Sequence, residues 1–364
     1  MAHRVIDWFR RRTRRRTFEA FQIEVTSRCD LHCVMCPKQA LATSWPSLDL
    51  PWEGFQRIAR SFPHVRHVHL QGWGEPLLHP RLFEMIGLAK AAGCRVGFTT
   101  NGMRLSHEVS GRLLEARLDL LVVSIAGATR DTHASIRAGS DLDRITENVR
   151  ALLSSRAVRG GRIPKVEIFF LMTRTNLAEL PQAVEWAAAL GADELVATNL
   201  DYVVTAAHDD LKAFGFPPQR GAFQRILDRT HEMAQAAGLA FRPYPLDLAE
   251  VAVCEANPLS MLFIASDGWV SPCTYMGLAT RTDIPRRFAG TAVSAPRLRF
   301  GNILERDLQE IWQSPAYRAF RRQFATRRLG LAMRTLRICP EGEALGAQAP
   351  PPEPCRSCYK LYGV

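Results

Sequence analysis

Three cysteines stand close together near the start of the chain. Cys29, Cys33 and Cys36 have the spacing C-x3-C-x2-C, and the next cysteine is Cys94. Thiolates at short, fixed spacings are the usual ligands of iron–sulfur clusters. Three of them can hold three irons of a [4Fe–4S] cubane and leave the fourth iron open. Because an open coordination position is typical of a reactive site, the spacing predicts a reactive cluster rather than a structural one.

Two other roles for these cysteines fit less well. A disulfide framework is disfavoured because three is an odd number and no signal peptide precedes the motif. A structural zinc site requires C-x2-C pairs or histidines at set spacings, and His32 is badly placed inside the loop. The open cluster therefore remains the favoured interpretation.

Apolar segments alternate with helix-like patterns from residue 20 onward. The expected strands are residues 21–26, 68–71, 95–99, 120–125, 166–172 and 194–199. The expected helices are residues 53–62, 80–92, 106–116, 141–156, 177–190 and 222–237, where apolar residues recur at helical spacing. This alternation predicts an α/β fold with a parallel sheet covered by helices.

The alternation stops at Pro243 and Pro245, so a domain boundary is expected near residue 240. The expected parts are a basic segment at 1–19, a barrel at 20–240 and a cysteine-rich region at 241–364.

The cysteine motif, placed directly after the first expected strand, resembles the radical S-adenosylmethionine (radical SAM) superfamily. The residue before the last cysteine is commonly aromatic in that family, and Met35 is a soft apolar substitute. The resemblance implies a partial (β/α)6 TIM-like barrel with its chemistry at the carboxyl ends of the strands. It also implies that SAM binds the open iron through its amino and carboxylate groups.

The segment Gln71–Pro76 resembles the family's GGEP motif, with Trp73 as an extra residue. By itself it would be a Gly–Pro turn with a solvated glutamate. Glycine lets the backbone approach a ligand closely, and a carboxylate can accept from the amino group of SAM. Gly72, Gly74 and Glu75 are therefore expected SAM contacts.

Further SAM contacts are expected at the ends of the later strands. Thr100 and Asn101 belong to a T-N-G sequence of the kind that lies beside SAM in the family, and Ser124 matches a family serine. Arg137 is a candidate partner for the SAM carboxylate because guanidinium forks suit carboxylates. Its alternative role is that of a surface helix residue. Asn199 is expected to face the adenine.

Five of the nine cysteines lie in the last third of the chain. Between Cys254 and Cys273 an Asp267–Gly268 turn separates two apolar segments, which predicts a small hairpin that brings the two thiols together. Cys355 and Cys358 form a C-x2-C pair. Two such pairs make a four-thiolate site that suits zinc or an iron–sulfur cluster.

This second set resembles the SPASM extension of radical SAM enzymes, and its shortened twitch version, because five cysteines are present instead of seven. The resemblance implies one auxiliary [4Fe–4S] cluster in a small α+β domain, with Cys254, Cys273, Cys355 and Cys358 as ligands. Cys339 is left over, either as a buried free thiol or as a replacement for one of the final pair.

The net charge of +11 is concentrated in two segments, residues 1–17 and 316–338, each with seven arginines. The remainder is slightly acidic, so a general nucleic-acid surface is not expected, and helix faces exposed to solvent are favoured. Residues 1–17 could also contact anionic lipid. Neither a transmembrane segment nor a secretory signal is recognisable, and nine cysteines without an export signal favour a reducing cytoplasm.

The resemblance implies an oxidoreductase-type or peptide- or metabolite-modifying enzyme. It would cleave SAM reductively to a 5′-deoxyadenosyl radical and abstract hydrogen from a peptide or small-molecule substrate, using a reductant such as flavodoxin or ferredoxin. No catalytic acid, base or radical relay residue is identified. Two alternatives stay open: a membrane-surface enzyme for a lipid-linked substrate, and a non-catalytic zinc and nucleic-acid binding protein.

Overall fold

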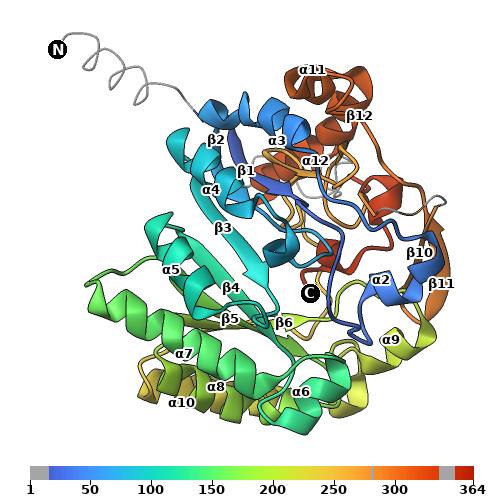
Figure 1. The fold of residues 1–364 in the computed structure, drawn as a ribbon. Coiled ribbons are helices and arrows are strands. Elements are labelled where there is room, and N and C mark those ends of the chain that lie inside the picture. Colours follow the sequence, from blue (N-terminus) through green and yellow to red (C-terminus); the bar gives the residue numbers. More distant parts are fainter. Residues whose placement is uncertain (1–15, 279, 281–282, 336–348) are drawn as a thin grey trace.

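The protein was analysed as a computed structural model that describes residues 16–278, 280, 283–335 and 349–364 (Figure 1). Within these residues the largest sheet has the strand order β12-β9-β8-β1-β2-β3-β4-β5-β6-β7. The strands from β1 to β7 are Phe18–Ile23, Val65–His69, Arg95–Thr100, Leu120–Ile125, Lys165–Met172, Glu194–Asn199 and Ala240–Pro243. Each pairs in parallel with the next.

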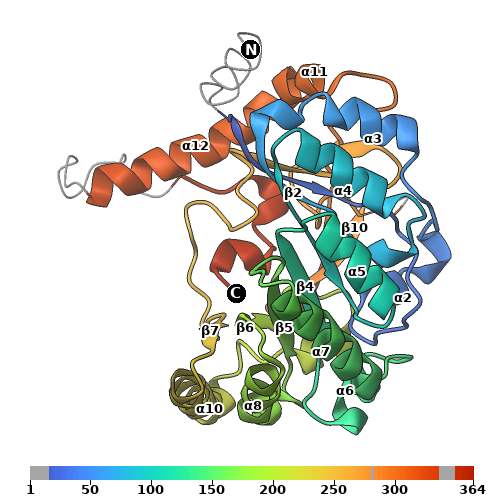
Figure 2. The same cartoon turned by 60° about the vertical axis from the view of Figure 1, so that its left-hand side comes forward.

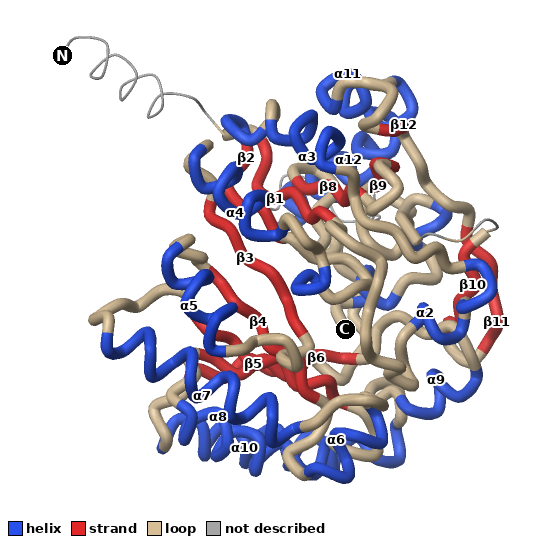
Figure 3. The backbone as a smooth tube through the Cα atoms, viewed as in Figure 1, coloured by secondary structure: helices blue, strands red, loops and turns tan. Residues whose placement is uncertain are grey.

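Helices cover the outer side of these strands, as Figures 1 and 3 show. The helices between β1 and β7 are α2 Pro37–Ala40, α3 Trp52–Ala59, α4 Leu82–Ala91, α5 His107–Glu115, α6 Arg130–Ile136, α7 Leu142–Val158, α8 Leu180–Leu190, α9 Ala206–Leu211 and α10 Pro217–Ala236. The α/β partial barrel expected from the sequence is confirmed. One further parallel strand, β7, lies on β6 at the place where the domain boundary was expected.

The first two strands begin three residues earlier than expected. Pairing starts where Phe18 meets Val65, and β1 ends at Ile23 instead of residue 26. Beyond Ile23 the chain turns to other partners, since Thr26 forms an isolated antiparallel bridge with Asp49. Apolar character alone did not mark this change because Val25 is also buried.

Several short helices were not expected from the sequence, among them α6 and α9. α6 and α9 have seven and six residues, which is too short for a helical period to stand out. Both begin with a capping threonine whose hydroxyl accepts a backbone N–H, Thr129 from Thr132 and Thr205 from His208.

The C-terminal region extends the same sheet beyond β1. β8 (Met261–Ile264) pairs in parallel with β1, and β9 (Trp269–Ser271) pairs with β8 in antiparallel fashion, which confirms the expected hairpin. Gly268 takes a φ of +82° in its turn, a conformation that glycine adopts without strain. β12 (Gly301–Asn302) completes this edge, and a separate hairpin joins β10 (Ile284–Phe288) to β11 (Thr291–Ala295).

The second arginine-rich segment largely forms helix α12 (Pro315–Thr335), preceded by α11 (Leu308–Gln313). Tyr317, Phe320 and Phe324 are buried against the body, whereas the last turns of α12 extend away from it (Figure 2). Cys339 and residues 1–15 of the basic segment lie outside the described residues. In the parts that are described, no helix is both long enough and apolar enough to cross a membrane.

Arg327 attaches α12 to the chain that precedes β8. Its buried guanidinium donates from Nε to Ala252 O at 3.0 Å and from Nη2 to Val251 O at 2.8 Å. Nη2 also pairs with Glu250 Oε1 at 2.7 Å. The sequence predicted that the arginines of this segment lie on a solvent-exposed helix face. Arg327 differs from that expectation because it is buried.

We expect Arg327→Ala to lower the free energy of unfolding by about 3 kcal/mol, because several buried carbonyls lose a charged donor. Urea unfolding of the full chain followed by circular dichroism measures this. Arg328→Ala, at an exposed neighbouring position, is the matched control and should change stability by less than about 0.5 kcal/mol. Equal effects in the two variants would contradict the anchoring role.

Candidate active site

A cavity of about 300 Å³ lies at the carboxyl ends of the parallel strands, the usual place for a site in such barrels. Its lining includes Cys29, Cys33, Cys36, Gly74, Glu75, Thr100, Asn101, Ser124, Arg137 and Asn199. The structure thus brings the three cysteines together with seven of the eight SAM contacts expected from the sequence, Asn199 included. Gly72 is the exception, because it does not line this cavity.

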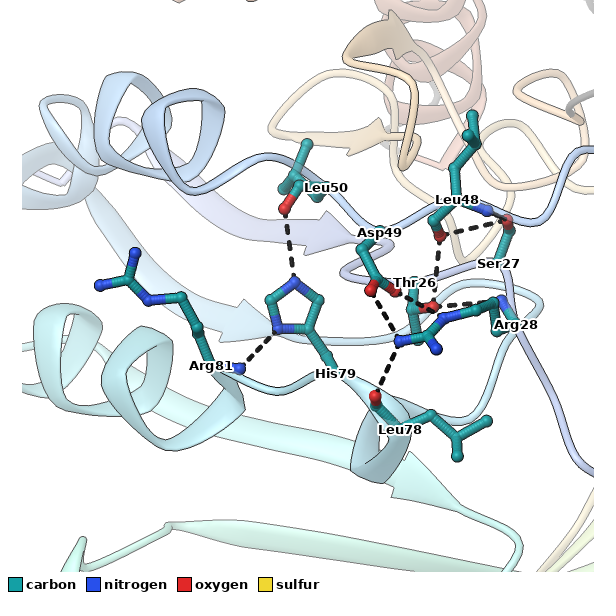
Figure 4. Close-up of polar contacts among 9 residues, drawn as sticks. All are labelled: Thr26, Ser27, Arg28, Leu48, Asp49, Leu50, Leu78, His79 and Arg81. Carbon is teal, nitrogen blue, oxygen red and sulfur yellow. Dashed lines mark hydrogen bonds and ion pairs between the residues drawn. The ribbon is translucent and has the colours of Figure 1, made fainter.

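The residue before the first cysteine anchors the cysteine loop (Figure 4). Arg28 forms a two-pronged contact with Asp49, Nε to Oδ1 at 2.9 Å and Nη2 to Oδ2 at 2.6 Å. Nη2 also donates to Leu78 O at 2.9 Å, and the backbone carbonyl of Arg28 accepts from Glu75 N at 2.8 Å. A single arginine therefore joins the loop to two segments that are distant in sequence.

The backbone before Arg28 is fastened in the same region (Figure 4). The hydroxyls of Thr26 and Ser27 both donate to Leu48 O, at 3.2 and 3.3 Å, and Leu48 N donates back to Ser27 Oγ at 2.9 Å. His79 Nε2 lies 3.3 Å from Leu50 O, two residues after Leu48. No sequence pattern predicted these contacts, because each joins residues that are about twenty or more positions apart in the chain.

The far side of the cysteine loop pairs with the chain after α6. His32 N donates to Ala138 O at 2.9 Å, and Val34 N donates to Ile136 O at 3.0 Å. These two bonds hold the segment of Arg137 against the cysteine loop, and Arg137 lines the same cavity as the three cysteines. Its Nε is buried and has no hydrogen-bond partner in the described structure, a condition that a bound carboxylate would relieve.

Glu75 is buried, and its hydrogen bonds join the segment after β2 to the end of β3. Its Oε1 accepts from Thr100 Oγ1 at 2.8 Å and from Leu77 N at 3.1 Å, and its Oε2 accepts from Asn101 N at 2.7 Å. Burial raises the pKa of Glu75 to about 7, although these hydrogen bonds oppose the rise. One acceptor position on Oε2 remains for a ligand.

Asn101 also holds the cysteine loop. Its Nδ2 donates to Asp30 Oδ1 at 2.9 Å, and its Oδ1 accepts from Met103 N at 2.9 Å. Arg104 Nε lies 2.7 Å from the other carboxylate oxygen of Asp30. The T-N-G segment therefore contacts both the cavity and the loop that carries the cysteines.

The two expected contact glycines are needed for close packing. A Cβ at Gly74 would lie 2.2 Å from Thr26 O and 2.6 Å from Arg28 O, and a Cβ at Gly72 would lie 2.3 Å from Glu24 Cγ. Such approaches are too close for any side chain. Gly72 therefore makes room for Glu24, and Gly74 lets the loop lie against the start of the cysteine motif.

Glu24 is a residue whose importance the sequence did not indicate. Its buried carboxylate accepts from Trp73 N at 2.8 Å through Oε1. Through Oε2 it accepts from Ser266 N at 3.1 Å and Ser266 Oγ at 2.9 Å. Burial raises the pKa of Glu24, and its backbone hydrogen bonds act in the opposite direction. One carboxylate thus joins the barrel to the C-terminal region.

The four expected auxiliary cysteines are neighbours in space. Burial, followed by repulsion from Cys273 and Cys358, raises the pKa of Cys254 to about 12. Burial, followed by repulsion from Cys358 and Cys273, also raises the pKa of Cys355. In the first set, burial and repulsion from Cys33 and Cys29 raise the pKa of Cys36 to about 12.

Bound iron would neutralise such crowded, buried thiolates, so both sets fit a cluster. Within the described ranges, no three His, Cys, Asp or Glu side chains gather tightly enough for a single metal ion. Cys94 is a buried free thiol whose Sγ donates to Phe62 O at 3.4 Å, so it is a core residue outside both cysteine sets.

Three aromatic side chains form a wall between the two cysteine sets. The ring of Tyr202 stacks on that of Tyr275 with centroids 5.0 Å apart, and the ring of Trp73 lies 5.6 and 5.9 Å from them. All three line the cavity. They also belong to the same apolar cluster as Cys273 and Cys355. We call Trp73, Tyr202 and Tyr275 the aromatic wall.

Comparison with known families decides the identity. The model of the radical SAM superfamily matches residues 23–187, and that of an iron–sulfur cluster-binding domain, SPASM, matches residues 254–359. The chain belongs to the radical SAM superfamily. SAM and a [4Fe–4S] cluster are the cofactors of this superfamily, and the SPASM domain binds auxiliary iron–sulfur clusters. The cavity and the second cysteine set lie within these two matched regions.

Named relatives of this radical SAM protein act on different substrates. It is 28% identical over 305 residues to the tungsten-containing aldehyde ferredoxin oxidoreductase cofactor-modifying protein of Pyrococcus furiosus, covering 82% of each chain. It is 27% identical over 326 residues to the PqqA peptide cyclase of Streptomyces rochei, covering 88% of this chain and 81% of that one.

A solved structure has the same fold at low identity. SuiB of Streptococcus suis, bound to S-adenosylmethionine, matches 93% of this chain and 78% of its own with a TM-score of 0.63 at 16% identity. A second SuiB structure, bound to the precursor peptide SuiA, matches 95% of this chain and 71% of its own with a TM-score of 0.59.

We expect Gly74→Ala to destabilise the protein by at least about 3 kcal/mol, because the new methyl group would meet backbone carbonyls that cannot move aside. Gly87→Ala in helix α4 is the control, since nothing lies within 4 Å of its Cβ position. It should stabilise the protein by up to about 1 kcal/mol. Thermal unfolding of the cluster-free chain measures both, and a tolerated Gly74→Ala would disprove the close approach.

Proposed function

We propose that this radical SAM protein removes a hydrogen atom and then one electron from a substrate held in the cavity. The observation that supports this is the position of the cavity between Cys29, Cys33 and Cys36 on one side and the aromatic wall on the other. When bound, the first cluster supplies the electron that cleaves SAM to a 5′-deoxyadenosyl radical, and the auxiliary cluster supplies an electron acceptor. The residues of the chain hold SAM and the substrate and orient them toward one another.

Three cavity residues are suited to hold SAM. Glu75 offers the free acceptor position of Oε2 to the amino group, and Arg137 offers a guanidinium with an unpartnered buried Nε to the carboxylate. Asn199 Oδ1 is also buried without a partner among the described residues, which suits an N–H donor such as the adenine amino group. Thr100, Asn101 and Ser124 shape the remaining wall, and Gly72 and Gly74 position the loop.

The substrate is proposed to be a peptide side chain or a small organic molecule that packs against the aromatic wall. The PqqA peptide cyclase and the cofactor-modifying relative act on these two classes by name. Asp201 stiffens the wall, because the Tyr275 hydroxyl donates to its Oδ1 at 2.6 Å and Lys360 pairs with its Oδ2 at 2.5 Å. Apolar aromatic contact with specific polar groups at the edges is typical of small-ligand sites.

We expect anaerobic reconstitution to yield about eight irons per chain, as two cubane clusters require, and to yield 5′-deoxyadenosine from SAM under reducing conditions. Cys273→Ala should lose about half the iron, whereas Cys94→Ala, a buried cysteine outside both sets, should keep all of it. Unchanged iron in Cys273→Ala would disprove the auxiliary site. Replacing Cys29, Cys33 and Cys36 by alanine should abolish SAM cleavage.

The same reconstitution tests the competing function. About one or two bound zinc ions without visible charge-transfer absorption would favour the zinc and nucleic-acid binding alternative. The reductant, the cytoplasmic location and a membrane contact through residues 1–17 stay predictions, as does the division at residue 240.

We expect SAM to bind more tightly as the pH rises from about 6 to about 8. Below its pKa of about 7 the Glu75 carboxyl is protonated and loses its charge and part of its acceptor capacity. Glu75→Gln should flatten this rise while the iron content stays high. Equilibrium binding of labelled SAM to the reconstituted protein at several pH values is the measurement, and an unaltered pH profile in the variant would remove Glu75 from the SAM site.

A further inference from the structure

A buried arginine on β10 has no acidic partner among the described residues. Arg286 is 3% exposed. Its Nη1 donates to Pro354 O at 2.9 Å, its Nη2 lies 3.4 Å from Met276 Sδ, and its Nε has no hydrogen-bond partner. Among the residues that the structure describes, no carboxylate forms an ion pair with it. A buried cation without a counter-charge is strongly disfavoured, so a negative charge is expected close by.

Arg286 lies close to the auxiliary thiols, because it contacts Pro354, the residue before Cys355, and Met276, three residues after Cys273. Burial disfavours the charge of Arg286, but attraction from Cys358, Tyr202, Cys273 and Cys355 outweighs it, and the pKa of Arg286 is raised. The thiols come from two separate parts of the chain, one before β10 and one after α12. Arg286 thus lies next to both halves of the proposed ligand set.

A second buried cation near these thiols is already neutralised. Lys360 pairs with Asp201 Oδ2 at 2.5 Å and also with Glu255. Its charge is therefore balanced within the protein, unlike that of Arg286. Within the described part of the chain, the cysteine thiolates and the group they would bind are therefore the source of negative charge for Arg286.

We propose that Arg286 is the internal counter-charge of the auxiliary cluster and holds its reduction potential above the value it would have without this cation. This inference rests on the auxiliary cluster proposed above. Reduction adds one electron, and hence one negative charge, to a cluster bound by four thiolates. A fixed cation in a poorly hydrated interior stabilises the reduced form more than the oxidised form, and net charge around a cluster is one of the factors that set its potential.

The position of Arg286 gives this effect a function. Its Cζ lies 5.9 Å from the ring centroid of Tyr202, and Tyr202 is part of the aromatic wall of the cavity. Arg286 is therefore next to the side of the thiol set that faces the substrate. With a cluster bound, a raised potential would make it a better acceptor for the one electron that the substrate radical gives up. The cluster would be reduced by that electron, and the oxidised substrate would lose a proton to water.

The test compares two variants at this position with a matched control. Arg286→Gln removes the charge and keeps donor groups, and Arg286→Lys keeps the charge without the planar fork. Arg287→Gln is the control, because Arg287 is the adjacent residue on β10 and pairs instead with Asp209 at 3.5 Å and with Gly290 O. Each is made in the full chain with Cys29, Cys33 and Cys36 replaced by alanine, so that only the auxiliary cluster contributes to the signal.

A redox titration followed by electron paramagnetic resonance and visible absorption gives the potential, and iron analysis gives cluster occupancy. We expect Arg286→Gln to shift the potential to more negative values, with Arg286→Lys close to the parent and Arg287→Gln unchanged. An unshifted potential in Arg286→Gln, or an equal shift in the Arg287→Gln control, would overturn the proposal.

Loss of the cluster is also informative. If Arg286→Gln loses its iron while Arg286→Lys retains it, the positive charge is required and the proposal stands. Loss of iron in both variants would mean that the shape of the arginine side chain, and not its charge, is what the cluster requires. That result would overturn the proposal. Absence of iron in the parent chain would refute the auxiliary cluster itself, which is a different failure.

Discussion

The pairing of β1 with two parallel neighbours is the constraint on which the rest of the structure depends. Phe21 lies opposite Val68 of β2 on one side and Leu262 of β8 on the other. Because parallel strands all end at the same edge, the cysteine loop, the Gly72–Pro76 turn and the C-terminal hairpin emerge together. Glu24 then joins the second and third of these through Trp73 and Ser266. The cavity and the auxiliary thiols are neighbours as a result of this one arrangement.

Several ionisable side chains are buried in and around the site. Glu24 and Glu75 are enclosed acids whose raised pKa values reflect burial and whose oxygens hold backbone N–H groups in place. Arg327 is enclosed among carbonyls and an acid, whereas Arg286 faces thiols. Charges are costly to bury, so each one indicates what its surroundings have to supply. In the C-terminal region that reasoning leads to an anionic metal cluster.

The sequence predicted the barrel well, for a physical reason. Strands such as Leu120–Ile125 and Glu194–Asn199 have an unbroken run of buried apolar residues at their centres, and they were placed with their observed bounds. β1 was displaced because its apolar run continues past the point where its partners change. Gly72 was expected at the ligand and is instead required by Glu24. Contacts such as those of Arg28 with Asp49 have no local signature, because their partners are brought together only by folding.

The sequence by itself determined the chemistry. The two sets of cysteines, the motif glycines and Glu75 are recognisable because thiolate spacing and backbone approach depend on residues close in the chain. Tertiary structure alone decided how these groups act on one another. It placed the aromatic wall between the two sets, gave Glu75 the burial that raises its pKa, and set Arg286 beside the auxiliary thiols. Distance, burial and unpaired charge are properties of the packed molecule, and they arise only when separate segments meet.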